Sequence, residues 1–139
     1  MAKETKDMLE QLKQADSLRG YLAENDGDMV SATVQEQLSV LLAETGLTKS
    51  EVLRRAEIND IYGYQLFAGS RKPSRDKMVA LCVGFGLSLD RTQQVLKAVG
   101  FAPLYAKNKR DSALIYGIEK GQTVPRINAA LYELGEPTL

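Results

Sequence analysis

Side chains capable of catalysis are scarce in this chain. Its 139 residues include no histidine and one cysteine, Cys82. Without histidine there is no Ser-His-Asp triad, no Cys-His pair and no imidazole ligand for a metal ion. A lone cysteine can neither close an internal disulfide nor build a thiolate zinc site, which favours a reducing compartment. We therefore expect a protein that is not an enzyme, with no catalytic residue, no metal site and no cofactor.

Positive charge gathers in one part of the chain. The formal net charge is zero, but residues 47–77 carry seven basic and four acidic side chains, whereas residues 1–31 carry four basic and seven acidic ones. Four of the basic residues, Arg71, Lys72, Arg75 and Lys77, lie within a single short segment. Such a cluster is typical of a surface that contacts phosphate groups, and solvated surface charge is the alternative interpretation.

The elements that position these side chains are predicted to be helices. The spacings Thr33 to Glu36 and Thr48 to Glu51 predict capping boxes, each followed by apolar residues at helical intervals. No segment shows the alternation of a strand. We expect an all-α fold, with helices over residues 5–24, 33–45, 48–56, 60–68, 75–84, 89–99, 109–120 and 124–134.

A domain boundary is predicted at residues 25–31 (NDGDMVS), which are rich in turn-forming and acidic residues. It would separate an acidic N-terminal helical extension, residues 1–31, from the rest. No apolar run approaches the ~20 residues of a membrane span. The first residues, MAKETKDMLEQLKQADS, mix charges where a signal peptide needs an apolar stretch. We therefore expect a cytoplasmic protein with no membrane partner.

The most informative stretch is residues 47–77. It combines a short capped helix, a tight turn at Glu57-Ile58-Asn59, a second short helix and a basic loop, Arg71-Lys72-Pro73-Ser74. Two short helices joined this tightly predict a helix-turn-helix. The motifs continue with Met78-Val79-Ala80-Leu81 and Leu87-Ser88-Leu89. In this order they resemble the lambda-repressor/Cro-like, or XRE-type, helix-turn-helix regulators over about residues 33–90.

The resemblance implies a sequence-specific DNA-binding transcriptional regulator. Residues 32–90 would be its DNA-binding domain, and residues 91–139 a C-terminal helical extension packed on the same core. The implied partner is double-stranded DNA, and a homodimer would read two half-sites about 34 Å apart.

The resemblance also implies which residues contact DNA. The start of the first short helix would lie at the phosphate edge, and the exposed face of the second would read base edges in the major groove. Glutamine can pair with adenine, isoleucine can touch a thymine methyl and aspartate can accept from cytosine. The implied contacts are Thr48, Lys49 and Ser50 at the phosphate edge, Asp60, Ile61 and Gln65 over the groove, and Arg71, Lys72 and Ser74 on phosphates.

Two positions depart from the family's pattern. Glu57 occupies the turn position where glycine is usual, so it must adopt a left-handed backbone or belong to a different turn. Gly63 replaces a branched aliphatic residue on the inward side of the second short helix. The other residues expected on the inward side of the turn and this helix are Ile58, Leu66 and Phe67. A glycine there weakens the helix by up to ~1 kcal/mol unless close packing requires it.

An alternative function is a protein–protein interaction module on the same scaffold, with little or no DNA binding. The second short helix contains no basic residue and begins with the acidic Asp60. Tyr62 and Tyr64 point in different directions on a helix, so we expect at least one of them to be buried or half-buried. The other is available to contact a sugar or a protein partner.

Overall fold

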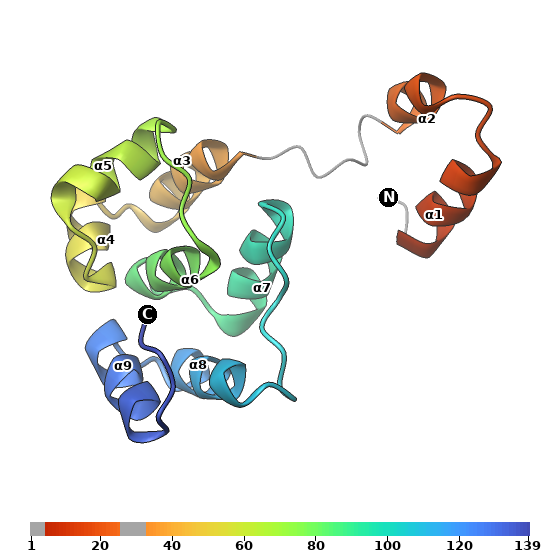
Figure 1. Ribbon diagram of the computed structural model, residues 1–139. Coiled ribbons are helices and arrows are strands. Elements are labelled where there is room, and N and C mark those ends of the chain that lie inside the picture. The colour runs from red at the N-terminus through yellow and green to blue at the C-terminus, as the bar shows by residue number, and fades with distance from the viewer. Residues whose placement is uncertain (1–4, 26–32) are drawn as a thin grey trace. The chain divides into compact units, whose positions relative to one another are not determined.

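The computed structural model describes residues 5–25 and 33–139, and every regular element in these ranges is an α-helix (Figure 1). The predicted all-α class is therefore confirmed for the described residues. None of the helices among them is both long and apolar enough to cross a lipid bilayer. The helices are α1 (Thr5–Gln14), α2 (Leu18–Glu24), α3 (Val34–Thr45), α4 (Lys49–Ala56), α5 (Asp60–Ala68), α6 (Arg75–Gly84), α7 (Leu89–Ala98), α8 (Lys109–Glu119) and α9 (Val124–Glu133).

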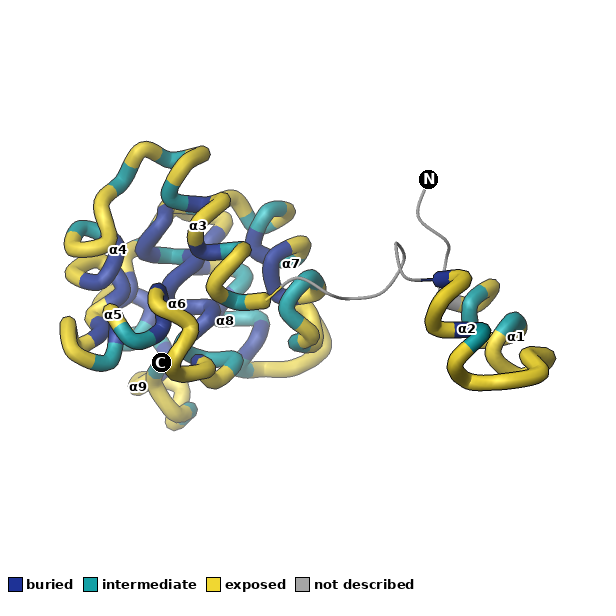
Figure 2. Tube along the Cα trace, turned by 90° about the horizontal axis from the view of Figure 1, so that it is seen from above, coloured by how far each residue is buried: buried dark blue, intermediate teal, exposed yellow. Residues whose placement is uncertain are grey.

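The chain divides into two compact units, Met1–Ser31 and Ala32–Leu139. In the first unit, the prediction of a single helix over residues 5–24 is wrong. It is interrupted because the extended backbone of Ser17 caps α2, with the Ser17 hydroxyl accepting a hydrogen bond of 3.0 Å from the amide of Gly20. Most described residues of α1 and α2 are exposed (Figure 2). The predicted joint at residues 25–31 lies outside the described residues from position 26 onward.

Local capping defines the helix starts of the second unit. The hydroxyls of Thr33 and Thr48 accept hydrogen bonds from the amides of Glu36 and Glu51, both at 3.1 Å, which is the first of the two bonds of a capping box. The return contact of Glu51 differs from the expected one, because its carboxylate accepts from the Thr48 hydroxyl at 3.0 Å. These side chains explain why the helix boundaries fall close to the predicted positions.

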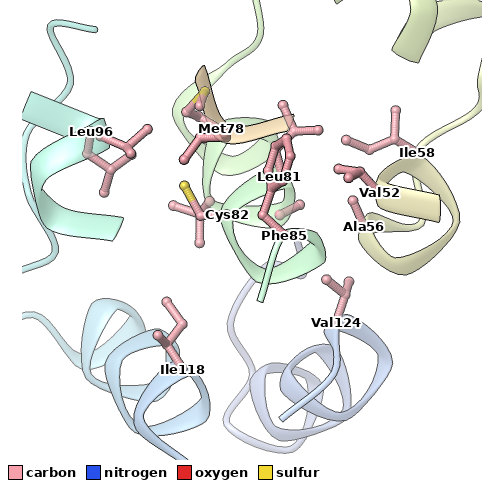
Figure 3. Packing of buried hydrophobic residues seen from close by; sticks show 14 of the residues in the cluster. Val52, Ala56, Ile58, Met78, Leu81, Cys82, Phe85, Leu96, Ile118 and Val124 are labelled. Atoms are coloured by element: carbon pink, nitrogen blue, oxygen red, sulfur yellow. The ribbon is translucent and has the colours of Figure 1, made fainter. Parts of the chain in front are cut away.

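A single hydrophobic cluster joins α3 to α9 in the second unit. Helix α6 is central to it and packs on α4, α7 and α9. Figure 3 shows Val52 of α4, Leu81 of α6, Leu96 of α7, Ile118 of α8 and Val124 of α9 in this cluster. The helices after residue 90 therefore share one core with those before it.

Helices α4 and α6 approach closely at a glycine. A Cβ placed on Gly84 would lie only 2.7 Å from the backbone carbonyl oxygen of Val52, and 3.1 Å from both the Cβ and the amide nitrogen of Ala56. Because two of these atoms belong to the backbone, a side chain could be accommodated only if the helices moved apart. Gly84 thus allows the close approach of α6 to α4.

The starts of α6 and α8 each carry an arginine next to an aspartate, and these residues form two crossed ion pairs between the helices. Arg75 forms an ion pair with Asp111 at 2.9 Å, and Arg110 forms one with Asp76 at 2.7 Å. Each guanidinium binds both oxygens of its carboxylate, the two-bond geometry that makes arginine pairs specific. The crossed pairs hold the first turn of α8 against the first turn of α6.

Candidate nucleic-acid interface

Residues 57–59 form the tight turn between α4 and α5. Glu57 has a left-handed backbone, with φ 56° and ψ 41°, and is the sole non-glycine residue with positive φ in the described part of the chain. The next amide, of Ile58, donates to the carbonyl of Leu53 at 3.0 Å, and the Ile58 side chain is buried. This is a Schellman-type helix end, and the side chains of Ile58 and Leu53 belong to the same buried cluster. The side-chain oxygen of Asn59 then caps α5 by accepting from the amide of Ile61 at 2.9 Å.

The residues predicted to lie on the inward side of this turn and of α5 are buried in the structure. Ile58, Gly63, Leu66 and Phe67 are all buried. A Cβ on Gly63 would overlap the side chain of Leu53, which is itself fully buried. The glycine is therefore required by close packing between α4 and α5, the condition under which its cost to the helix is offset.

The outward face of α5 is exposed and carries no basic residue. Asp60, Ile61 and Gln65, which the resemblance assigns to the groove, lie on this face, with Gln65 partly buried. Ile61 is 75% exposed, and Tyr64 beside it is 46% exposed. The prediction that at least one of the two tyrosines is buried or half-buried does not say which, although the spacing of Tyr64, three from Ile61 and four from Asp60, indicates the same face. Tyr64 therefore joins the candidate interface, whereas Tyr62 is half-buried.

Two cations flank α5 by stacking on its own aromatic rings. The Nζ of Lys49, from the first turn of α4, lies 5.8 Å from the centroid of the Phe67 ring. The guanidinium of Arg71, from the loop after α5, lies 5.2 Å from the centroid of the Tyr62 ring. Both distances fall within the ~6 Å over which a cation is attracted to a ring face. Positive charge is thus held beside a helix that has no basic residue of its own.

The loop between α5 and α6 presents the remaining predicted contacts. Gly69 has φ 80°, and the amides of Ser70 and Arg71 then donate to the carbonyl of Gln65 at 3.0 and 3.3 Å. Arg71, Lys72 and Ser74 are exposed. The Ser74 hydroxyl caps α6 by accepting from the amide of Lys77 at 3.2 Å. The loop is therefore anchored at both ends while its charged side chains face solvent.

Arg75 belongs to the basic cluster predicted to contact phosphates, but its side chain bonds within the protein instead. Its guanidinium donates to both oxygens of Asp111, and also to the carbonyls of Ala102 at 2.9 Å and Pro103 at 3.0 Å. These four bonds occupy most of the guanidinium's N–H donors within the protein. The hydrogen bond to Asp111 raises the pKa of Arg75. Burial alone would raise the pKa of Asp111, but the bonds from Arg75 and from the Tyr105 amide lower it overall.

The start of α4 supplies the other predicted phosphate contacts. Thr48, Lys49 and Ser50 are all exposed. The Thr48 hydroxyl is engaged within its own helical turn, since it both accepts from the Glu51 amide and donates to the Glu51 carboxylate. This leaves Lys49 and Ser50 as the outward-facing polar side chains of that turn.

Catalytic groups do not converge on any of these surfaces. Cys82 is buried, and burial raises its pKa to about 12, so the thiol remains protonated near neutral pH. Among the described residues, no three acidic or cysteine side chains are grouped as metal ligands would be.

No protein-family model, curated protein or solved structure matches this chain. Its function must therefore be inferred from the geometry of α4, α5 and the loop that follows.

Proposed function

We propose that the chain is a sequence-specific DNA-binding transcriptional regulator of the lambda-repressor/Cro-like, XRE-type family, with α4 and α5 as its helix-turn-helix. The observation that carries this proposal is the pair of stacked cations. Lys49 on Phe67 and Arg71 on Tyr62 hold positive charge against two rings of α5, a helix that has no basic residue of its own. Such an arrangement suits a helix that enters a groove lined by phosphates on both edges.

In this mechanism α5 lies in the major groove of double-stranded DNA. Gln65 pairs with an adenine, Ile61 contacts a thymine methyl group, and Asp60 accepts from a cytosine amine. Tyr64, on the same exposed face, contacts a neighbouring base or sugar edge. A homodimer places two copies of α5 in half-sites about 34 Å apart.

Affinity and register come from contacts to phosphates. These contacts come from exposed side chains around α5, namely Lys49, Ser50, Arg71, Lys72 and Ser74. Arg71 and Lys72 are the principal ones, because they are two adjacent exposed cations in the loop directly after α5 and, like Lys49, form no ion pair with a carboxylate among the described residues. Thr48 contributes through the helix start rather than through its hydroxyl, which Glu51 engages.

The salt dependence of DNA binding tests this proposal. A randomised duplex pool is bound at several salt concentrations by the wild type and by the double variant Arg71→Ala, Lys72→Ala. We expect weaker binding to all sequences and a salt slope reduced by about two, since each lost phosphate contact removes about one unit. The matched control is Arg54→Ala, Arg55→Ala. It removes the same charge from exposed residues in the last turn of α4, at the opposite end of that helix from Lys49.

Equal losses in the two double variants would refute the assigned interface, because only total charge would then matter. No salt-sensitive binding by the wild type at low ionic strength would refute DNA binding altogether. Sequence reading is tested by Gln65→Ala, which we expect to relax preference at one base position by about 1–3 kcal/mol while leaving the salt slope unchanged.

A protein–protein interaction module is the second candidate. The observation that favours it is the apolar exposure on α5, where Ile61 is 75% and Tyr64 46% exposed beside an acidic Asp60. In this case a stoichiometric protein partner would be lost on Ile61→Ala or Tyr64→Ala and retained by Arg71→Ala, Lys72→Ala. The reverse pattern, with retention by the α5 variants and loss with the cations, would exclude this surface as the protein interface.

A further inference from the structure

A groove of about 550 Å³ lies in the second unit, next to the basic loop. Its walls come from the first turn of α3, the loop between α5 and α6, and the residues that follow α7, three segments far apart in the sequence (Figure 1). The volume falls within the ~300–1,000 Å³ of small-molecule sites. The groove is thus large enough for a compact organic ligand.

The lining of this groove has two chemical parts. Val34, Pro73, Val99 and Phe101 supply apolar walls. Pro73 is buried and the other three are half-buried, so these side chains have fixed surroundings and still face the groove. A ligand with an apolar body would remove this surface from water, which is favourable in proportion to the area covered.

The polar part consists of Thr33, Gln35 and the two cations Arg71 and Lys72, which carry its charge. Both line the groove, and no carboxylate is paired with either of them among the described residues. Arg71 is partly oriented by the ring of Tyr62, so Lys72 is the cation with more freedom to turn toward a ligand. Positive charge that no carboxylate of the described residues neutralises, beside apolar walls, is complementary to a molecule that is apolar at one end and anionic at the other.

We infer that this groove binds a small amphipathic carboxylate whose apolar body lies against Phe101 and Val99 and whose anionic group is held by Lys72 and Arg71. The second part of the inference rests on the proposed function. Because Arg71 and Lys72 are also the main phosphate contacts, the ligand and DNA compete for them, and each lowers the affinity of the other by the same factor. The groove then regulates DNA binding through shared cations.

The probe for the first part is octanoate, with octanol as its uncharged counterpart. The full chain, labelled with ¹⁵N, is titrated with each compound, and backbone amide shifts are followed. We expect octanoate to shift the amides of Gly69 and Phe101, in the groove wall, more strongly than amides elsewhere. Octanol is expected to bind about tenfold more weakly, as is octanoate to Lys72→Gln, since a charge-assisted contact of this strength is lost in each case.

The matched control is Lys77→Gln, which removes one positive charge from α6 outside the groove lining. We expect it to bind octanoate as the wild type does. Equal affinity for octanoate and octanol, equal weakening in both lysine variants, or shifts centred away from the groove would each overturn the assigned site.

The second part is tested by adding octanoate to the wild-type complex with its selected DNA duplex. Release of DNA by octanoate, and not by octanol at the same concentration, supports the competition. Retained DNA with the groove saturated by octanoate overturns it. A wild type that binds octanoate in the groove and binds no duplex at any salt concentration refutes the proposed function and the competition while the ligand site stands.

Discussion

Replacing Arg75 by glutamine is expected to separate fold stability from DNA binding. Arg75 lies in the same basic segment as Arg71, but its guanidinium donates four hydrogen bonds within the protein, to Asp111 and to two backbone carbonyls. Glutamine can replace at most part of this set. The side chain of Asp111, only 9% exposed, would keep its charge and lose its main partner.

The magnitude follows from these contacts. Removing one partner of a fully buried ion pair costs about 3–5 kcal/mol. The side chain of Arg75 is 27% exposed, so water recovers part of the loss. We therefore expect the free energy of unfolding to fall by about 2–3 kcal/mol. For a unit of this size that corresponds to a decrease in Tm of roughly 10 °C.

The assay is thermal and urea unfolding followed by circular dichroism, together with the salt slope of DNA binding. Lys77→Gln is the control, since it removes the same charge two positions away on α6. We expect Arg75→Gln to lose stability and keep the salt slope at temperatures where it is folded, and Arg71→Gln to do the reverse. A stability change of Arg75→Gln within about 0.5 kcal/mol of the wild type, the scale of an ordinary surface substitution, would refute the reasoning. So would a reduced salt slope in that variant.

Four further predictions concern single positions. Glu57→Gly should stabilise the protein by about 1 kcal/mol in urea unfolding, because the left-handed backbone is strained for glutamate and not for glycine; no gain would mean that the turn carries no strain. Gly84→Ala should destabilise by about 1–3 kcal/mol through collision with the Val52 carbonyl, and wild-type stability would contradict that close approach. The pKa of Asp111 is lowered in the fold, so its contribution is complete above the unfolded pKa of about 3.9 and is lost as pH falls through the folded value; Asp111→Asn should remove this part of the acid sensitivity, and an unchanged acid unfolding profile would count against it. Burial raises the pKa of Cys82 to about 12, so a thiol reagent at pH 8 should label it only at the rate of unfolding, whereas fast labelling of the native protein would contradict its burial.

Helix boundaries could be predicted well from the sequence because capping is local. Thr33 and Thr48 each bond to an amide three residues along, so the signal lies within one turn of chain. The break between α1 and α2 is hard to predict for a related reason. Apolar residues continue at helical spacing across residues 15–17, and this periodicity concealed the cap that Ser17 forms.

Which of the basic side chains are exposed and which form internal ion pairs could not be predicted in the same way. Arg71 and Arg75 are four positions apart in one basic cluster, and nothing local distinguishes the exposed arginine from the one paired inside. The distinction comes from Asp111, which is 36 positions further along the chain and meets Arg75 only after α8 has packed. The stacking of Lys49 on Phe67 likewise depends on how α4 and α5 cross, which the sequence pattern leaves open.

The exchanged Arg-Asp pairs also bear on how relatives of this chain could be recognised. Positions 75 and 111 depend on each other, as do positions 76 and 110, and the two couplings cross. Reversing the charges within one coupled pair preserves the attraction, whereas a single replacement leaves a carboxylate or a guanidinium without its partner. Over evolutionary time these positions should therefore change in matched pairs. Such paired substitution between the starts of α6 and α8 could mark a distant relative even where few individual residues still agree.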